Sequence, residues 1–169
     1  MTTTVKQIEH GHVYEDFELG KVFEHHWGRT IRESDNTLFC ALTMQYGPLY
    51  TNVEYARMIG YKDIPVHPLL LWNLVAGLSV EDLSEAGGPF LGIDDVEFHR
   101  PVYPGDTIRS RSVVVSRRPS ASRAGWGIVE WRTTAVNQRD ESVLEYRRRN
   151  LSRMRAVPAP VVKANEPKK

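Results

Sequence analysis

"HPLLLWNLVAGLSVEDLSEAGG", residues 67–88, has apolar side chains on every face of a helix for about four turns. A helix that is apolar all round is typical of the interior of a domain, whereas a surface helix has one polar face. Gly87 and Gly88 follow, and glycine often ends a helix because it adopts the left-handed conformation without strain. The stretch predicts a long buried helix at the centre of the fold.

Four segments after this helix combine alternating or β-branched residues with turn-forming links, which is typical of antiparallel strands. They span residues 92–103, 106–118, 126–138 and 142–154. Before the central helix, residues 21–31 resemble a strand, residues 36–46 a helix capped by Ser34 or Asp35, and residues 53–61 a short helix. The order predicts an α+β domain whose antiparallel sheet wraps around a long buried helix.

Length and composition indicate one domain. The chain has 169 residues, of which 41% are hydrophobic and 25% charged, enough for a single core. We expect the domain to cover residues 13–155, with residues 1–12 and 156–169 as flexible ends. The 22 Lys and Arg against 21 Asp and Glu leave a net charge of +1, so no overall field favours nucleic acid or an anionic membrane.

The single cysteine and the lack of a long apolar segment bear on location. Cys40 has no partner for a disulfide and lies in an apolar helical pattern, which favours a buried structural thiol in the reducing cytoplasm. The N-terminus does not resemble a signal peptide, and the run "PLLLW" is far shorter than the ~20 residues of a membrane helix. The pairs His10/His12 and His25/His26 lack nearby acids, so we read them as solvent-facing and expect no metal site.

Residues 43–52, "TMQYGPLYTN", form a polar, turn-forming segment between two helical patterns. Such loops often carry binding and catalytic groups. Gln45, Tyr50 and Asn52 are therefore candidates for contact with a ligand.

Five segments along almost the whole domain resemble one known family. "GRTIRESDNTLF", "TMQYGPLYTNVEYA", "HPLLLWNL", "FHRPVYPGDTI" and "GIVEWRTTAVNQR" are similar to segments of the MaoC-like (R)-specific acyl-thioester hydratases and dehydratases of the hotdog fold. The details are nearest to the branch that acts on short, branched or dicarboxylic acyl-CoAs such as mesaconyl- or itaconyl-CoA. The resemblance implies a small-molecule acyl thioester of coenzyme A or of a carrier protein as substrate, no other cofactor, and a homodimer or larger homo-oligomer.

The working motif of that family resembles D-x-N-P-L-H, followed eighteen residues later by a glycine at the start of the central helix. The carboxylate and imidazole move protons during addition of water, and the glycine N–H binds the thioester oxygen. Aligned without a gap, the aspartate position falls on Gln45, the histidine on Tyr50 and the glycine on Pro68.

All three positions differ in chemistry from the family pattern. An amide does not accept a proton, a tyrosine is a hydrogen-bond donor at neutral pH, and proline has no N–H. Loss of acid–base help typically costs about 10²–10⁴ in rate and loss of one oxyanion donor about 10²–10³. We therefore expect an altered catalytic set of Gln45, Tyr50 and His67, in which His67 has either an acid–base role or a purely structural one.

Six further residues are candidates for binding substrate. Two are amides near the expected cleft, one is an arginine in the "FHRPVY" segment, and three form an arginine cluster that either grips phosphates of coenzyme A or is a solvated turn. They are Asn52, Asn73, Arg100, Arg117, Arg118 and Arg123. We read Arg147 to Arg149 on the last strand as edge protection or a subunit contact.

Three functions are compatible with these residues. The first is a hydratase or dehydratase for an enoyl- or 3-hydroxyacyl thioester. The second is another reaction in the same pocket, such as elimination, isomerisation or cyclisation. The third is a non-catalytic acyl-thioester-binding subunit, paired with a homologue that keeps the Asp and His. The persistence of the pocket-forming segments favours the first.

Overall fold

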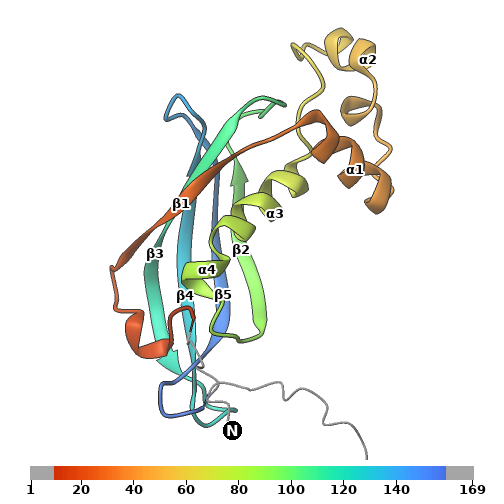
Figure 1. Ribbon diagram of the computed structural model, residues 1–169. Helices are drawn as coiled ribbons and strands as arrows, with labels where there is room; N and C mark the ends of the chain where they lie inside the picture. Colours follow the sequence, from red (N-terminus) through yellow and green to blue (C-terminus); the bar gives the residue numbers. More distant parts are fainter. Residues whose placement is uncertain (1–9, 159–169) are drawn as a thin grey trace, which may run out of the picture.

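The computed structural model describes residues 10–158, which form one five-stranded antiparallel sheet with helices on one side (Figure 1). The order across the sheet is β1-β3-β4-β5-β2. The strands are β1 (Val22–Thr30), β2 (Phe90–Phe98), β3 (Thr107–Pro119), β4 (Trp126–Val136) and β5 (Ser142–Arg153). The predicted antiparallel hotdog sheet is confirmed. Because β5 lies between β4 and β2, the reading of its arginines as edge protection is wrong.

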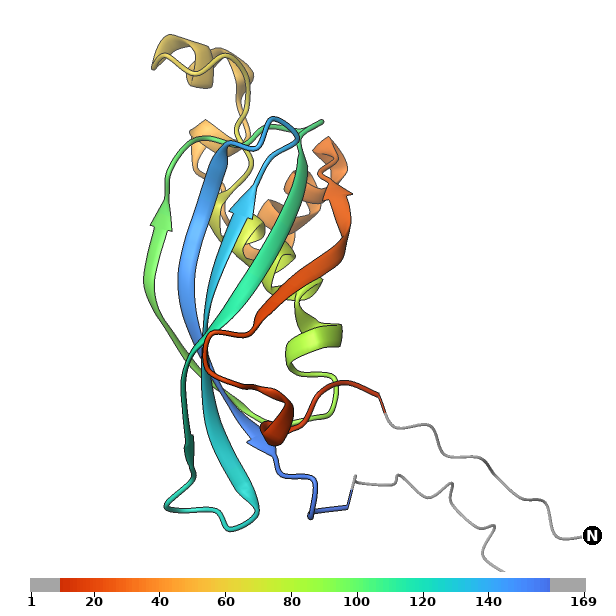
Figure 2. The ribbon, with the colours of Figure 1, turned by 90° about the vertical axis from the view of Figure 1, so that its left-hand side faces the viewer.

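The helices lie along one face of the sheet and beyond one of its ends (Figure 2). They are α1 (Glu33–Thr43), α2 (Val53–Met58), α3 (Pro68–Leu78) and α4 (Val80–Leu83), with 3-10 turns at Tyr14–Asp16 and Pro48–Tyr50. The sheet curves around α3 and α4, whereas the segment with α1 and α2 overhangs the end of the sheet (Figure 1). The overhang is the segment that contains "TMQYGPLYTN".

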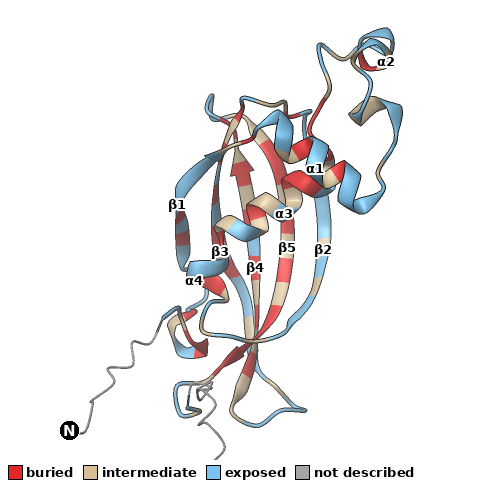
Figure 3. Ribbon diagram, turned by 45° about the vertical axis from the view of Figure 1, so that its right-hand side comes forward, coloured by how far each residue is buried: buried red, intermediate tan, exposed pale blue. Residues whose placement is uncertain are grey.

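The predicted central helix differs from the observed one in two respects. It is divided at Ser79, whose hydroxyl donates to the carbonyl of Ala76 (2.7 Å), and α4 ends at Leu83, before the two glycines. The sheet also buries only one side of α3, so that Leu69 on the other side remains 50% exposed (Figure 3). A single sheet covers only one side of a helix. Some apolar residues of α3 therefore stay partly exposed in this chain, although the sequence predicted burial on every side.

Two apolar clusters hold the helices on the sheet. The first lies between α3 and the sheet and includes Leu71, Val75 and Ile108. The second surrounds Trp131 at the other end, where the ring of Phe17 meets the indole edge-on with centroids 5.0 Å apart. Both clusters contain residues from β3, β4 or β5, whose alternating pattern places every second side chain on the helix side of the sheet.

Several smaller expectations have clear outcomes. The first helix begins at Glu33, so Ser34 lies inside it, and the Asp35 carboxylate accepts a hydrogen bond from the N–H of Arg32 (2.8 Å). Cys40 is buried, as predicted, and burial raises the pKa of its thiol. Within residues 10–158 no helix is both long and apolar enough to cross a membrane.

The predicted flexible ends, residues 1–12 and 156–169, lie largely outside the described residues. Of the described part, His12 contacts the domain, since its Nδ1 lies 2.8 Å from the carbonyl oxygen of Asp82.

Candidate active site

Tyr50 ends the 3-10 turn of the overhang and lies between two cavities. The larger, of about 760 Å³, opens between α1 and the loop that follows α2 and includes Cys40 and Lys62 in its lining. The smaller, of about 280 Å³, lies between the overhang, the start of α3 and the segment after β2. Tyr50 is thus shared by the linings of both cavities.

The smaller cavity brings together residues that the family resemblance aligned with a catalytic centre. Its lining includes Tyr50 and Pro68, which occupy the histidine and glycine positions, as well as Leu71 and Arg100. Gln45 is half-buried just after α1 and lines neither cavity. Two of the three aligned positions therefore meet in one space, and the third, Gln45, lies outside its lining.

His67 is buried behind Tyr50, with the two ring centroids 4.5 Å apart. Its backbone N–H donates to Oδ1 of Asn36 (2.8 Å), and its Nδ1 accepts from the N–H of Leu69 (3.2 Å). Burial lowers the pKa of the imidazole, so the neutral ring is favoured and carries its proton on Nε2. In this arrangement neither ring nitrogen is free to accept a proton. The contacts match the structural interpretation of His67, and its acid–base role remains a prediction.

The first turn of α3 offers few donors to a thioester oxygen. Pro68 has no N–H, the N–H of Leu69 is bonded to His67, and that of Leu71 donates to the His67 carbonyl (3.1 Å). Burial raises the pKa of Tyr50, so its hydroxyl keeps its proton at neutral pH. The Tyr50 hydroxyl is therefore one side-chain donor that this site can offer to a thioester oxygen.

Two amide side chains predicted to contact substrate, those of Asn52 and Asn73, form hydrogen bonds at or within their own helices. The side chain of Asn52 caps α2 by accepting from the N–H of Tyr55 (3.1 Å). Asn73 is exposed and donates to the carbonyl of Leu69 within its own helix (2.7 Å). Both side chains thus have local structural roles, and their contact with substrate remains a prediction.

The arginine cluster lies far from Tyr50 in this chain. Arg117, Arg118 and Arg123 belong to the β3–β4 hairpin, at the end of the sheet opposite the overhang (Figure 1). The guanidinium of Arg117 donates to the carbonyl of Phe17 (2.9 Å), and that of Arg123 lies 4.0 Å from the centroid of the Trp126 ring. The chain by itself does not bring these arginines to the cavity.

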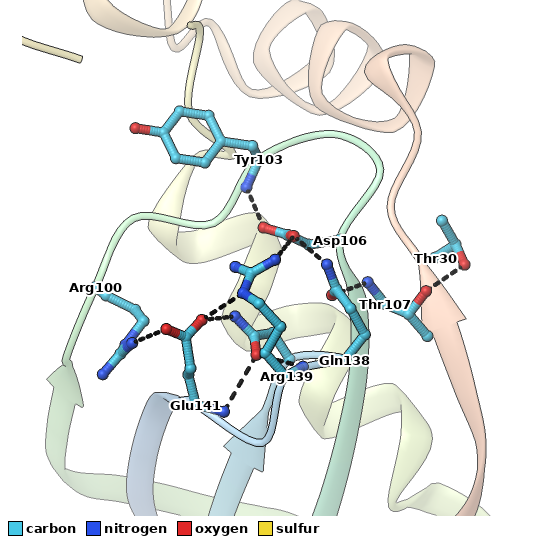
Figure 4. A network of polar contacts seen from close by, with 9 residues as sticks. Thr30, Arg100, Tyr103, Asp106, Thr107, Gln138, Arg139 and Glu141 are labelled. Atoms are coloured by element: carbon cyan, nitrogen blue, oxygen red, sulfur yellow. Dashed lines mark hydrogen bonds and ion pairs between the residues drawn. The ribbon is translucent and has the colours of Figure 1, made fainter. Parts of the chain in front are cut away.

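The segment after β2 is held by the turn between β4 and β5 (Figure 4). One Asp106 oxygen accepts from the N–H of Tyr103 (2.9 Å), and the other accepts from Nε2 of Gln138 (2.8 Å). The side-chain Oε1 of Gln138 in turn accepts from the N–H of Thr107 (3.0 Å). The two quoted segments "FHRPVYPGDTI" and "AVNQR" therefore meet and fix one wall of the smaller cavity.

Glu141 completes this network. It belongs to one of the links that the sequence pattern marked only as turn-forming, so the sequence alone assigned it no role. Its Oε2 accepts from Nδ2 of Asn137 (2.7 Å) and Nε of Arg139 (2.9 Å), and its Oε1 pairs with Nη1 of Arg100 (2.8 Å; Figure 4). The hydrogen bonds from Asn137 and Arg139 hold the pKa of this carboxyl below its ordinary value. Glu141 thereby fixes Arg100 at the cavity.

His25 is buried, so the expectation that it faces solvent is wrong. Its Nδ1 lies 2.7 Å from Oδ2 of Asp82, and its Nε2 lies 2.8 Å from the Ser112 hydroxyl, which is 2.7 Å from the Thr133 hydroxyl. A carboxylate only accepts, so Nδ1 donates to Asp82. Burial lowers the pKa of His25, and in the neutral ring Nε2 then accepts from Ser112. This chain of bonds ties α4 to β1 and β3. Ser112 is fully buried, which makes the arrangement structural rather than nucleophilic.

We expect the free energy of unfolding to decrease as the pH is lowered, because His25 is buried in its neutral form. Burial lowers its pKa, opposed by Asp82 and assisted by the charge of Arg148. Below the ordinary histidine pKa of about 6.5, the unfolded chain takes up the proton before the folded one, so the free energy of unfolding decreases. The slope from one such group is at most about 1.4 kcal/mol per pH unit. Chemical denaturation at pH 7.5 to 5 should show a shallower decline in His25→Gln than in the wild type.

Because burial also lowers the pKa of His67, the variant should keep part of the decline. An identical pH dependence in the variant and the wild type would contradict a folded-state shift at His25.

A five-stranded antiparallel sheet that wraps around one helix is the architecture of a hotdog domain. A family model described as mesaconyl-CoA hydratase matches residues 2–165. The chain belongs to the mesaconyl-CoA hydratase family.

Individual relatives agree with this assignment. The chain is 39% identical to the mesaconyl-CoA hydratase of Haloarcula hispanica over 144 residues, which are 85% of this chain and 40% of that protein. The crystal structure of a MaoC domain protein dehydratase from Chloroflexus aurantiacus matches with a TM-score of 0.83 at 32% identity, over 96% of this chain and 46% of that one.

A Mycobacterium tuberculosis protein with a double hotdog fold matches with a TM-score of 0.78 at 22% identity, over 89% of this chain and 47% of that one, and this likeness shows the fold alone. The chain thus spans less than half the length of the proteins with which it is compared here.

Proposed function

We propose that this chain is a hotdog unit of a hydratase or dehydratase that acts on an acyl-CoA with a short, branched dicarboxylic acyl group. The observation that carries the proposal is the 39% identity to a mesaconyl-CoA hydratase over 85% of the chain. The smaller cavity supports it, because about 280 Å³ is below the ~300–1,000 Å³ of pockets for drug-sized ligands and suits a short acyl group.

Tyr50 would bind the thioester in this cavity. Its hydroxyl keeps its proton and can donate to the thioester carbonyl, which draws electrons from the double bond. Water would then add to the polarised alkene, or leave the hydroxyacyl group in the reverse direction. Coenzyme A is part of the substrate, and the reaction needs no other cofactor. We place this activity in the cytoplasm, where a free thiol such as Cys40 stays reduced.

The second candidate function is that of an acyl-CoA-binding half without its own base. It is favoured by the lack of an N–H at Pro68, by the hydrogen bonds that the N–H groups of Leu69 and Leu71 already make, and by the bonded Nδ1 of His67. In this case the proton transfer would take place in a second hotdog unit that keeps the aspartate and histidine.

One experiment separates the two candidates. The purified chain is incubated with mesaconyl-CoA and a panel of enoyl- and 3-hydroxyacyl-CoAs, and each thioester is analysed by mass spectrometry. A mass change of one water with the chain alone supports the hydratase. Saturable binding of mesaconyl-CoA without a mass change supports the binding half, and neither binding nor turnover overturns both.

An exposed apolar surface along the edge strand β2 supports the assembly of two hotdog units into a dimer. The edge strand β2 exposes large apolar side chains, and α3 leaves Leu69 uncovered. The exposed β2 residues are Phe90, Leu91, Ile93, Val96 and Phe98. Two-fold pairing through β2 would place the hairpin end of one chain beside the overhang of the other. The arginine cluster of the partner would then approach the cavity, where guanidinium groups suit the phosphates of coenzyme A.

We therefore expect Ile93→Lys to weaken self-association, because a buried, unpaired ammonium is strongly unfavourable in an apolar interface. Sedimentation velocity over a concentration series should show a shift toward monomer. Val22→Lys on the opposite edge strand β1, where Val22 is 52% exposed, is the matched control and should leave the oligomer unchanged. Equal behaviour of the two variants would rule out β2 as the pairing edge.

A further inference from the structure

A dicarboxylic acyl group has a second carboxylate that must be bound inside the cavity. Taking a carboxylate out of water is costly unless a cation or several donors compensate for it. Most of the smaller cavity is lined by apolar side chains, including Leu49, Val66 and Val102. The site therefore needs a cationic group at one defined place.

Arg100 supplies a permanently charged group of this kind. It lines the smaller cavity together with Tyr50, whereas its ion-pair partner Glu141 does not line it. The carboxylate of Glu141 thus holds the guanidinium through Nη1 from outside the cavity lining, in the network of Figure 4. Arginine stays charged at all relevant pH values and has five N–H donors in a planar fork, so a guanidinium held through one nitrogen can bind a second carboxylate.

The frame around Arg100 restricts its movement. Glu141 is itself bonded to Asn137 and Arg139, so the ion pair is fixed at the carboxylate. Asp106 holds the turn that follows Arg100 by accepting from the N–H of Tyr103. A guanidinium whose partner is fixed loses less conformational freedom when it binds a ligand. Its fixed position also favours selection between acyl groups over non-specific attraction of anions.

We infer that Arg100 selects dicarboxylic acyl groups by binding their distal carboxylate, while Tyr50 binds the thioester at the other end of the same cavity. The inference rests on the proposed function. It makes Arg100 a specificity-determining residue, and it assigns the opposite ends of one short acyl group to two side chains that the sequence places fifty residues apart.

The test compares two ligands with the same branched skeleton. Mesaconyl-CoA has a distal carboxylate where 2-methylcrotonyl-CoA has a methyl group, and the dissociation constant of each is measured by titration calorimetry. Arg100→Met should weaken binding of mesaconyl-CoA about 10- to 100-fold, the range for losing a charge-assisted bond, and change that of 2-methylcrotonyl-CoA less than about twofold. Arg100→Lys should recover part of the loss.

Arg109→Met is the matched control, because Arg109 is similarly exposed and ion-paired, with Asp140, but does not line this cavity. It should leave both dissociation constants unchanged. Equal weakening of both ligands by Arg100→Met, or no effect on either, overturns the role of Arg100 and leaves the proposed function standing. Failure of the wild type to bind either ligand overturns the proposed function together with this inference.

Discussion

The double variant Gln45→Asp/Tyr50→His is expected to hydrate mesaconyl-CoA about 10²–10⁴ times faster than the wild-type chain. The two substitutions place a carboxylate and an imidazole at the positions where the family keeps its acid–base pair. Tyr50 lines the smaller cavity, so an imidazole at this position has direct access to a thioester bound there, and residue 45 follows α1 in the same overhang. Adding Pro68→Gly should raise the rate by about a further 10²–10³, because it supplies an N–H at the start of α3.

Initial rates with mesaconyl-CoA measure the gain, at substrate concentrations well below saturation. The matched control is Gln45→Asn/Tyr50→Phe, which changes the same positions without supplying a group that accepts protons. It should show no gain. A double variant that is folded and binds mesaconyl-CoA, yet hydrates it no faster than the control, would contradict the placement of the site.

Trp131→Ala should lower the free energy of unfolding by about 3–5 kcal/mol, the usual range for removing a buried large aromatic side chain. Trp131 is fully buried in β4, and its ring contacts that of Phe17 and lies 5.5 Å from the guanidinium carbon of Arg148. The substitution leaves a cavity and removes the ring that packs near the guanidinium of Arg148.

Urea denaturation monitored by circular dichroism measures this loss. Trp27→Ala is the matched control, since Trp27 is 76% exposed, and it should change the free energy by no more than about 0.5 kcal/mol. Similar losses in both variants would show that the buried cluster around Trp131 does not anchor this end of the sheet.

Much of the fold is predictable from local sequence pattern. The segment 126–138 became β4, Trp126–Val136, because its alternation of apolar and polar residues matches the two-residue repeat of a strand. The end of the central helix was not predictable in the same way. Ser79 interrupts it well before the glycines, through a bond of its own side chain that no periodicity signals.

The placement of the site was predictable in part. Alignment to the family motif puts Tyr50 and Pro68 in one site, and both line the smaller cavity. The contacts of Glu141 with Arg100 and of Asp82 with His25 were not predictable, because each joins segments 41 or more residues apart in the chain. Charged residues in turns read as solvated until the fold supplies their partners.

The sequence by itself determined the strands, the helices, the family and the approximate place of the site, because each depends on patterns within a few residues or on an aligned motif. The tertiary structure alone decided which side chains are free to act there. In the folded chain the N–H of Leu69 donates to Nδ1 of His67, and Glu141 fixes Arg100 at the cavity. The physical reason is that the chemistry of a polar group depends on its hydrogen-bond partners, and those partners come from segments brought together only by folding.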